Sequence, residues 1–279
     1  MAKSHRLMVG DITCIVLEEG TVAVDLSNIA NRYPNATEEE IQEALDDIGY
    51  TGGMVENYYN ALYVESADTK ILFDAGMGKN PERSDIGQII PSLALEGIAP
   101  EDIDIVYITH FHGDHYLGLL TDGQPTFPNA RYITLDKEWD YWLDNDDEAM
   151  AQRVEGIKKI VAPLRDQFST VSAGDSIAEG VSVMAIPGHT MGQSAIKIES
   201  GDETLIHLVD LLHHTAQFKF PNWHFVWDTD GDLGVETRRA QLGNAANRNL
   251  LVMFYHLPYP ALGHVERHDG AFQWLPLSE

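Results

Sequence analysis

Residues 109–115, with the sequence Thr-His-Phe-His-Gly-Asp-His, place four potential metal ligands within six positions. They come at the end of residues 103–109, an apolar run that is typical of a buried strand. His110 and His112 stand two positions apart, so in extended backbone their side chains point the same way. Imidazole nitrogens together with a carboxylate oxygen are the ligands that zinc-type ions prefer. The segment therefore predicts a metal site where a buried strand ends.

The pattern His-x-His-x-Asp-His resembles the signature of the metallo-β-lactamase superfamily, and the resemblance runs from about residue 58 to the end of the chain. Four further segments are similar to that family's motifs in order and spacing: residues 71–76, 187–190, 209–210 and 255–256. Val209 stands where the family usually has glycine, and Met191 and Gln193 stand where proline and histidine are frequent. These differences concern the backbone beside the expected ligands.

The resemblance implies two divalent metal ions, with zinc as the first expectation, bridged by a carboxylate and a hydroxide. The implied ligands are His110, His112 and His189 for one ion, Asp114, His115 and His256 for the second, and Asp210 as the bridge. Asp114 and Asp210 are thus expected to be catalytic as well as ligating. Asp74 should lie behind the ligands and orient a histidine or the motif loop. The alternative for Asp74 is a turn aspartate at a strand end.

Within the superfamily, residues 256–265 and 212–218 resemble segments of the methyl-parathion-hydrolase-like branch, which is related to the quorum-quenching N-acyl homoserine lactonases. In that branch the first histidine of the 256–265 segment is the ligand. The resemblance therefore favours His256 as ligand and places His264 behind the ligands or at the pocket rim. Those lactonases have a tyrosine three residues after the bridging aspartate, where this chain has His213. We expect His213 to donate a hydrogen bond to the substrate; a structural histidine is the alternative.

A short stretch of the chain that follows Asp210 is rich in aromatic residues. These residues predict an apolar pocket. The expected pocket residues are Phe218, Phe220 and Trp223 from this stretch, with Trp142 at a position that resembles a pocket aromatic of the phosphotriesterases. Such a pocket suits a small neutral hydrophobic substrate and needs no basic residues. The alternative for the stretch is an aromatic lid or a contact in a homodimer.

These features lead to two functional hypotheses from different classes. The first is a metal-dependent hydrolase of neutral lactones or esters, of the N-acyl homoserine lactone or aryl ester type. Its variant is a phosphotriester hydrolase, because both reactions place a developing anion on a metal. The second is a metal-binding protein with a sensing or redox use and no hydrolysis. The expected apolar pocket favours hydrolysis.

The charge balance excludes some classes of binding partner. The chain of 279 residues has 44 acidic and 18 basic residues, a formal net charge of −26. Such a surface repels phosphate backbones and anionic lipids, so we expect no nucleic-acid substrate and no membrane association. The amino-terminal residues carry charge without an apolar run behind them, and this pattern predicts a cytoplasmic protein. Cys14 is the only cysteine, so no disulfide can form within the chain.

The elements that must hold these residues are short strands and helices in both halves. We expect a hairpin formed by residues 7–17 and 21–26 with its turn at Glu19–Gly20, and a helix after a capping box at residues 37–40. Residues 58–66 and 70–74 alternate like paired strands, and a charged helix should cover residues 148–167. This order favours an α+β fold, a four-layer αββα sandwich in one domain over residues 1–279. Residues 24–54 would form an amino-terminal insertion or lid, and we expect a homodimer.

Overall fold

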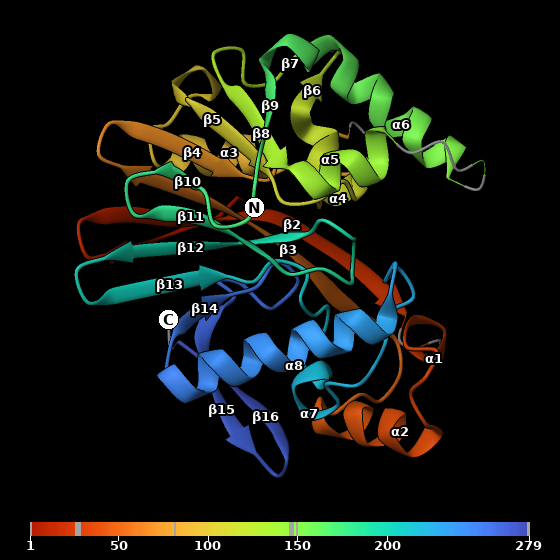
Figure 1. The fold of residues 1–279 in the computed structure, drawn as a ribbon. Helices are drawn as coiled ribbons and strands as arrows, with labels where there is room; N and C mark the ends of the chain where they lie inside the picture. The colour runs from red at the N-terminus through yellow and green to blue at the C-terminus, as the bar shows by residue number, and fades with distance from the viewer. Residues whose placement is uncertain (1, 26–28, 81, 145–147, 149, 278–279) are drawn as a thin grey trace.

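Two β-sheets lie face to face, with helices on both outer sides (Figure 1). The computed structural model describes residues 2–25, 29–80, 82–144, 148 and 150–277. Among these residues, the first sheet has the strand order β1-β2-β3-β4-β5-β8-β9 and the second the order β10-β11-β12-β13-β14-β15-β16. Helices α3, α5 and α6 cover the first sheet, and α8 covers the second. The expected four-layer αββα sandwich is confirmed.

The strands of the first sheet are β1 Ser4–Val9, β2 Ile12–Asp25, β3 Met54–Ser66, β4 Thr69–Phe73, β5 Ile105–Ile108, β8 Arg131–Leu135 and β9 Phe168–Val171. Those of the second are β10 Ser176–Ala178, β11 Val181–Ala185, β12 Ser194–Ser200, β13 Glu203–His207, β14 Leu251–Met253, β15 Leu262–His268 and β16 Ala271–Pro276; β6 Leu120–Thr121 and β7 Gln124–Pro125 form a small hairpin. The helices are α1 Ile29–Arg32, α2 Glu38–Asp47, α3 Ile89–Leu95, α4 Gly113–Tyr116, α5 Asp136–Leu143, α6 Ala151–Val161, α7 Ala216–Lys219 and α8 Gly231–Arg248, with 3-10 turns η2 Pro100–Asp102, η3 Leu117–Leu119 and η4 Ala162–Gln167.

Strand alternation explains the layers, because successive side chains point to opposite faces of a sheet. In β3, Leu62 and Val64 face the core between the two sheets, whereas Ala61 and Tyr63 face the core under the helices. Both faces of the central strands are therefore apolar, as a sheet buried on both sides requires. A third core packs α8 against the outer face of the second sheet, for example through Leu242.

Parallel pairing gathers the functional segments at one edge of the sandwich. Strand β4 pairs in parallel with β5, β5 with β8, and β13 with β14. The carboxyl ends of these strands therefore open in the same direction within each sheet. The segments that leave them carry Asp74, His110, Glu138, Asp210 and His256. Loops at the carboxyl ends of strands commonly form the ligand sites of such sheets.

The local predictions held where a short-range signal dictates the backbone. Thr37 caps α2, and its side chain and that of Glu40 bond to each other's backbone N–H groups as the capping box predicts. The predicted strand pair exists as β3 and β4, joined across Ala67 in the left-handed region. The charged helix is shorter than expected, since it gives way to a 3-10 turn at Ala162, just before Pro163.

The predicted hairpin at the amino terminus is wrong. Its turn lies at Gly10–Asp11, and β2 continues through Glu19 and Gly20 as one strand with a bulge. The Glu-Gly pair looks like a turn in the sequence, but Glu19 is fully buried. Its carboxylate accepts backbone hydrogen bonds from Met77, Gly87 and Ile89, so it fixes an incoming loop instead of facing solvent.

Residues 24–54, the predicted insertion or lid, lie between β2 and β3 and contain α1 and α2; residues 26–28 fall outside the described residues. Ile29, Tyr33 and Ala44 of this segment form a buried cluster with Trp223 and Phe225. The segment therefore packs on the aromatic stretch after Asp210, as Figure 1 shows for α1, α2 and α7.

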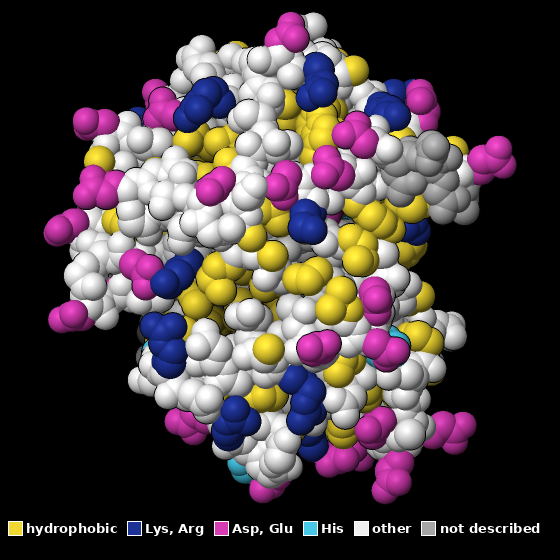
Figure 2. Space-filling model, in the orientation of Figure 1, with side chains coloured by type: hydrophobic (Ala, Val, Ile, Leu, Met, Phe, Trp, Pro, Cys, Tyr) yellow, Lys and Arg dark blue, Asp and Glu magenta, His cyan; other side chains and the backbone are white. Residues whose placement is uncertain are grey.

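The surface matches the acidic composition. Figure 2 shows acidic side chains spread over most of one face, while hydrophobic side chains gather where the upper and lower halves of the molecule meet. Within the described ranges, none of the helices is both long and apolar enough to cross a bilayer.

Candidate active site

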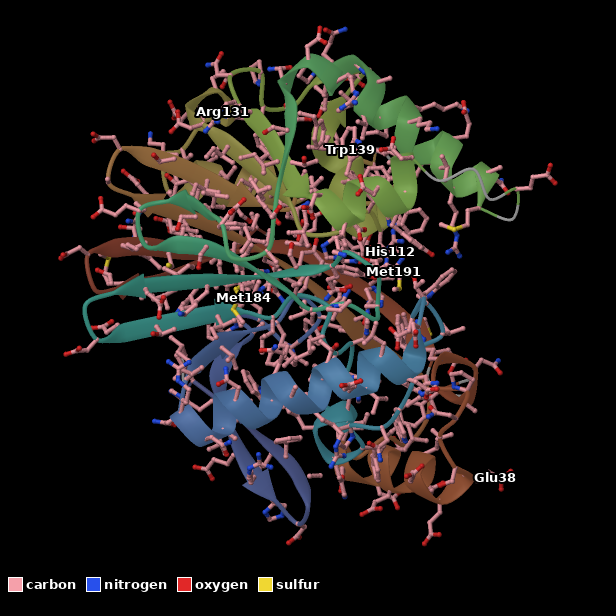
Figure 3. The ribbon with its side chains drawn as sticks, viewed as in Figure 1. Glu38, His112, Arg131, Trp139, Met184 and Met191 are labelled. Atoms are coloured by element: carbon pink, nitrogen blue, oxygen red, sulfur yellow. The ribbon has the colours of Figure 1, made fainter. Side chains whose placement is uncertain are left out.

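The expected metal ligands come together at the carboxyl-end edge of the sandwich. Three groups of side chains each offer ligand atoms that lie within 4.8 Å of one another. The first ligand group is His110, His112 and His189, and the second is Asp114, His115, Asp210 and His256. These two are the sets that the family motifs imply, and they come from four separate segments of the chain. The third group, His189, Asp210 and His213, overlaps both of them. Figure 3 shows His112 in the region between helix α5 and the lower half of the molecule.

Asp210 occupies the centre of this arrangement. Its Oδ2 lies 3.1 Å from His256 Nε2, 3.4 Å from both His115 Nε2 and His189 Nε2, and 3.6 Å from His110 Nε2. Burial alone would raise the pKa of Asp210, but the surrounding imidazoles hold it well below its usual range. One charged carboxylate thus contacts both ligand groups, which is the position a bridging ligand requires.

The polar atoms at this centre fit a metal site. His110 Nε2, His115 Nε2 and Asp210 Oδ1 are buried without a hydrogen-bond partner. Burial and the neighbouring imidazoles hold the pKa of His110 and His112 well below the usual value, so their nitrogen lone pairs are free to bind. Buried polar atoms without partners are costly, and two divalent ions would satisfy them.

Two carboxylates orient the histidines from behind. Asp74 Oδ2 lies 2.8 Å from His115 Nδ1, and both oxygens accept hydrogen bonds from Thr109. Asp228 Oδ1 lies 2.9 Å from His189 Nδ1. Such contacts fix the ring and leave the opposite nitrogen for a metal. Asp74 was predicted for this role, but Asp228 was not, because it lies 39 positions from His189 and follows no recognisable motif.

Val209 shows how the chain accommodates its departure from the family's glycine. Its φ is +48°, in the left-handed region that β-branched residues rarely adopt. The side chain is fully buried in the core under the first sheet. Burial of this side chain holds a strained backbone just before Asp210, where a glycine would be relaxed.

A cavity of about 750 Å³ opens above the ligand groups. Its lining includes Trp142, Phe225 and Trp227 as well as Met77 and Ile86. The site thus combines an apolar wall with a polar floor, as binding pockets for small molecules commonly do.

The other expected pocket residues lie elsewhere. Phe218, Phe220 and Trp223 are not among the residues that line this cavity. Phe218 stacks on Trp274 at 5.4 Å between ring centroids, and Phe220 stacks on Trp223 at 4.9 Å. These rings instead fill the contacts with the carboxy-terminal hairpin and with α1 and α2. Aromatic content alone could not show which part of the stretch faces the cavity.

The structure places His264 and His213, whose roles the sequence left open, differently relative to the cavity. His264 lies in β15 opposite Leu275 and is not among the residues that line the cavity, which speaks against a place at the pocket rim; its alternative place behind the ligands stays a prediction. His213 lines the cavity, with Nε2 3.3 Å from Asp210 Oδ2 and its ring stacked on Phe225 at 3.7 Å. Burial lowers the pKa of His213 to about 3, so it is neutral at physiological pH.

Three arginines line the cavity, although the expected apolar pocket needs no basic residues: Arg32, Arg83 and Arg153. Arg83 forms an ion pair with Asp85, and Arg153 lies over the Trp227 ring at 5.3 Å. Arg32 makes no ion pair within the described part of the chain. The cavity can therefore bind a polar oxygen of the substrate as well as its apolar part.

Comparison with known proteins assigns the family. The model of the metallo-β-lactamase superfamily matches residues 55–254, so the chain belongs to that superfamily. Among curated relatives, the N-acyl homoserine lactonase of Bacillus cereus is 24% identical over 161 residues, which cover 51% of this chain and 59% of the relative. The transcription termination factor FttA of Cenarchaeum symbiosum is 26% identical over 225 residues, which cover 75% of this chain and 33% of that protein. The chain thus spans less than two thirds of both relatives.

Solved structures match over the whole chain. The hydrolase AbOPH of the β-lactamase superfamily has a TM-score of 0.90 at 29% identity, covering 100% of this chain and 99% of its own. AidC, a dizinc quorum-quenching lactonase in complex with a product, N-hexanoyl-L-homoserine, has a TM-score of 0.91 at 24% identity, covering 100% and 98%. The overall fold is therefore shared with these two proteins.

Proposed function

We propose that this protein is a dinuclear metal hydrolase that opens neutral lactones, of the N-acyl homoserine lactone type, or cleaves related esters. The observation that carries the proposal is the meeting of both ligand groups at Asp210 on the floor of an aromatic-walled cavity. The similarity to proteins named as N-acyl homoserine lactonases supports the substrate class.

The residues around the cavity divide the work of the reaction. Two bound divalent ions, with zinc as the first candidate, would supply a nucleophile from water at neutral pH and polarise the substrate carbonyl. Trp142 and Phe225 would hold the apolar part of the substrate. Arg32 would bind a carbonyl oxygen away from the scissile bond. Together these contacts orient the ester group toward Asp210 and His213.

His213 is placed to stabilise the charge that develops during the reaction. As a neutral imidazole it carries one N–H; its Nε2 lies 3.3 Å from Asp210 Oδ2, and its Nδ1 has no hydrogen-bond partner. Stacking between Phe225 and His256 holds the ring plane. A fixed donor of this kind acts on the oxygen that gains negative charge as the carbonyl carbon becomes tetrahedral.

His213→Ala should lower kcat by about 100-fold and change KM by less than about threefold, because the contact strengthens only in the transition state. His213→Gln should restore part of kcat, since its amide can donate from a similar position. Steady-state kinetics on an acyl homoserine lactone measure both constants. The amount of bound metal should stay unchanged in both variants. A loss of metal would indicate that His213 is a metal ligand and not a hydrogen-bond donor to the substrate. A rise in KM at unchanged kcat would remove the proposed role.

A panel of four substrates tests the proposed class. We expect kcat/KM to be highest for an acyl homoserine lactone or an aryl ester, lower for a phosphotriester and lowest for a β-lactam. The acidic surface disfavours anionic substrates, and the aromatic wall favours neutral apolar ones. A phosphotriester that proved best would replace lactones as the substrate class. Metal binding without turnover of any of the four would favour the sensing or redox hypothesis.

A further inference from the structure

Glu138 is a buried carboxylate that the proposed reaction does not use. It lies in the first turn of α5 and has no exposed surface. Its Oε1 accepts hydrogen bonds from Phe111 N at 2.8 Å and Trp142 Nε1 at 2.8 Å. Its Oε2 accepts from Thr190 Oγ1 at 2.6 Å and Gly192 N at 3.1 Å. Four donors thus use the full capacity of both oxygens, and no cationic side chain pairs with them in the described residues.

The four donors come from the segments that the site most needs to hold in place. Phe111 stands between His110 and His112, and Thr190 directly follows His189. These three histidines form the first ligand group. The fourth donor, Trp142, lines the cavity and has its ring centroid 6.2 Å from that of His112. One side chain therefore joins both histidine loops and the cavity wall.

The packing around Glu138 shows a close approach between α5 and the 187–193 loop. A Cβ atom at Gly192 would lie 2.1 Å from the backbone nitrogen of Glu138. Only glycine allows the loop backbone to come this near. Figure 3 shows the neighbouring Trp139 on α5 above His112, so the helix overlies the histidine segment.

We propose that Glu138 is a positioning residue that locks the His110–His112 segment, the His189 loop and Trp142 into one geometry. The inference rests on the proposed metal site, and it assigns Glu138 no contact with substrate. A carboxylate fits because three of the four partners are N–H groups, which can only donate, and the Thr190 hydroxyl donates as well. A glutamine offers one acceptor oxygen, and its NH2 group can donate to the Thr190 hydroxyl but would leave at least the N–H of Gly192 without an acceptor.

Glu138→Gln tests the lock through metal retention, which needs no substrate. We expect a chelator to remove metal from the first ligand group about tenfold faster than from the unchanged protein, as for other partners that orient metal ligands. Thr190→Val removes a single donor at nearly constant volume and should show a smaller acceleration, about threefold. The matched control is Thr134→Val, which removes a buried hydroxyl bonded to the Ile108 carbonyl oxygen and should leave the chelation rate unchanged.

Trp142→Phe tests the contact of Glu138 with the cavity wall separately from its contacts with the two histidine segments. It removes the Nε1 donor but keeps an aromatic ring, so KM should rise about threefold or more while chelation of metal stays slow. Equal chelation rates in Glu138→Gln and the unchanged protein would overturn the inference. So would equal rates in Thr190→Val and Thr134→Val, because Glu138 would then only stabilise the fold. If the unchanged protein binds no metal, the proposed function itself fails. That outcome is distinguishable from a failure of the inference, because it is measured before any variant is made.

Discussion

Asp210→Asn should lower kcat/KM for the best substrate by at least about 1,000-fold, roughly 4 kcal/mol of transition-state stabilisation. The carboxylate oxygen that contacts both ligand groups would become a neutral amide atom, while five imidazole nitrogens remain within 3.6 Å of that position. Removing the charge also weakens metal binding, so bound metal should fall below two ions per chain. Kinetics and elemental analysis of the same preparation measure both effects.

Asp269→Asn is the matched control for this variant. Asp269 lies in the turn between β15 and β16 with its side chain 91% exposed, and it belongs to none of the ligand groups. It should match the unchanged protein in activity and metal content. If Asp210→Asn kept its activity within about tenfold, Asp210 would not be the bridge between the two ligand groups.

His256→Ala should have the second largest effect, a loss of one metal ion per chain and at least about 100-fold in kcat/KM. His256 belongs to the second ligand group. The backbone carbonyl oxygen of Tyr58 accepts a hydrogen bond from its Nδ1 at 2.9 Å, which leaves Nε2 facing Asp210. Removal of this imidazole leaves that group with one nitrogen ligand, His115. Elemental analysis should then find about one ion per chain.

His264→Ala provides the comparison, because it is the same substitution eight positions away. His264 lies in β15, outside the cavity lining, so metal content and kcat/KM should stay close to those of the unchanged protein. The opposite pattern, with metal lost only from His264→Ala, would mean that the wrong histidine has been assigned to the site.

The parts of the site that stand together in short sequence motifs could be predicted from the sequence. Residues 110–115 carry four potential ligands in one turn of chain, and the remaining ligands stand in short motifs at strand ends. The partners behind them could not be predicted this way. Asp228 meets His189 across 39 positions and Glu138 meets Thr190 across 52, and only the packed fold brings such segments together.

The fold shows the same division between local and tertiary signals. The capping box at Thr37 is determined by four neighbouring residues and was predicted correctly. The role of Glu19 depends on a loop 58 to 70 positions away, so the sequence favoured a turn instead. The aromatic stretch likewise offered several similar rings, and tertiary contacts decide that Phe225 lines the cavity while Trp223 packs on Tyr33.

The most direct test of the central claim is a zinc titration of the protein after a chelator has removed its metal. Opening of an acyl homoserine lactone and bound zinc are followed together. The two ligand groups predict no activity in the stripped protein and a rise to a plateau at about two zinc ions per chain. Full activity without metal, or a plateau at one ion with no further binding, would contradict a dinuclear hydrolase.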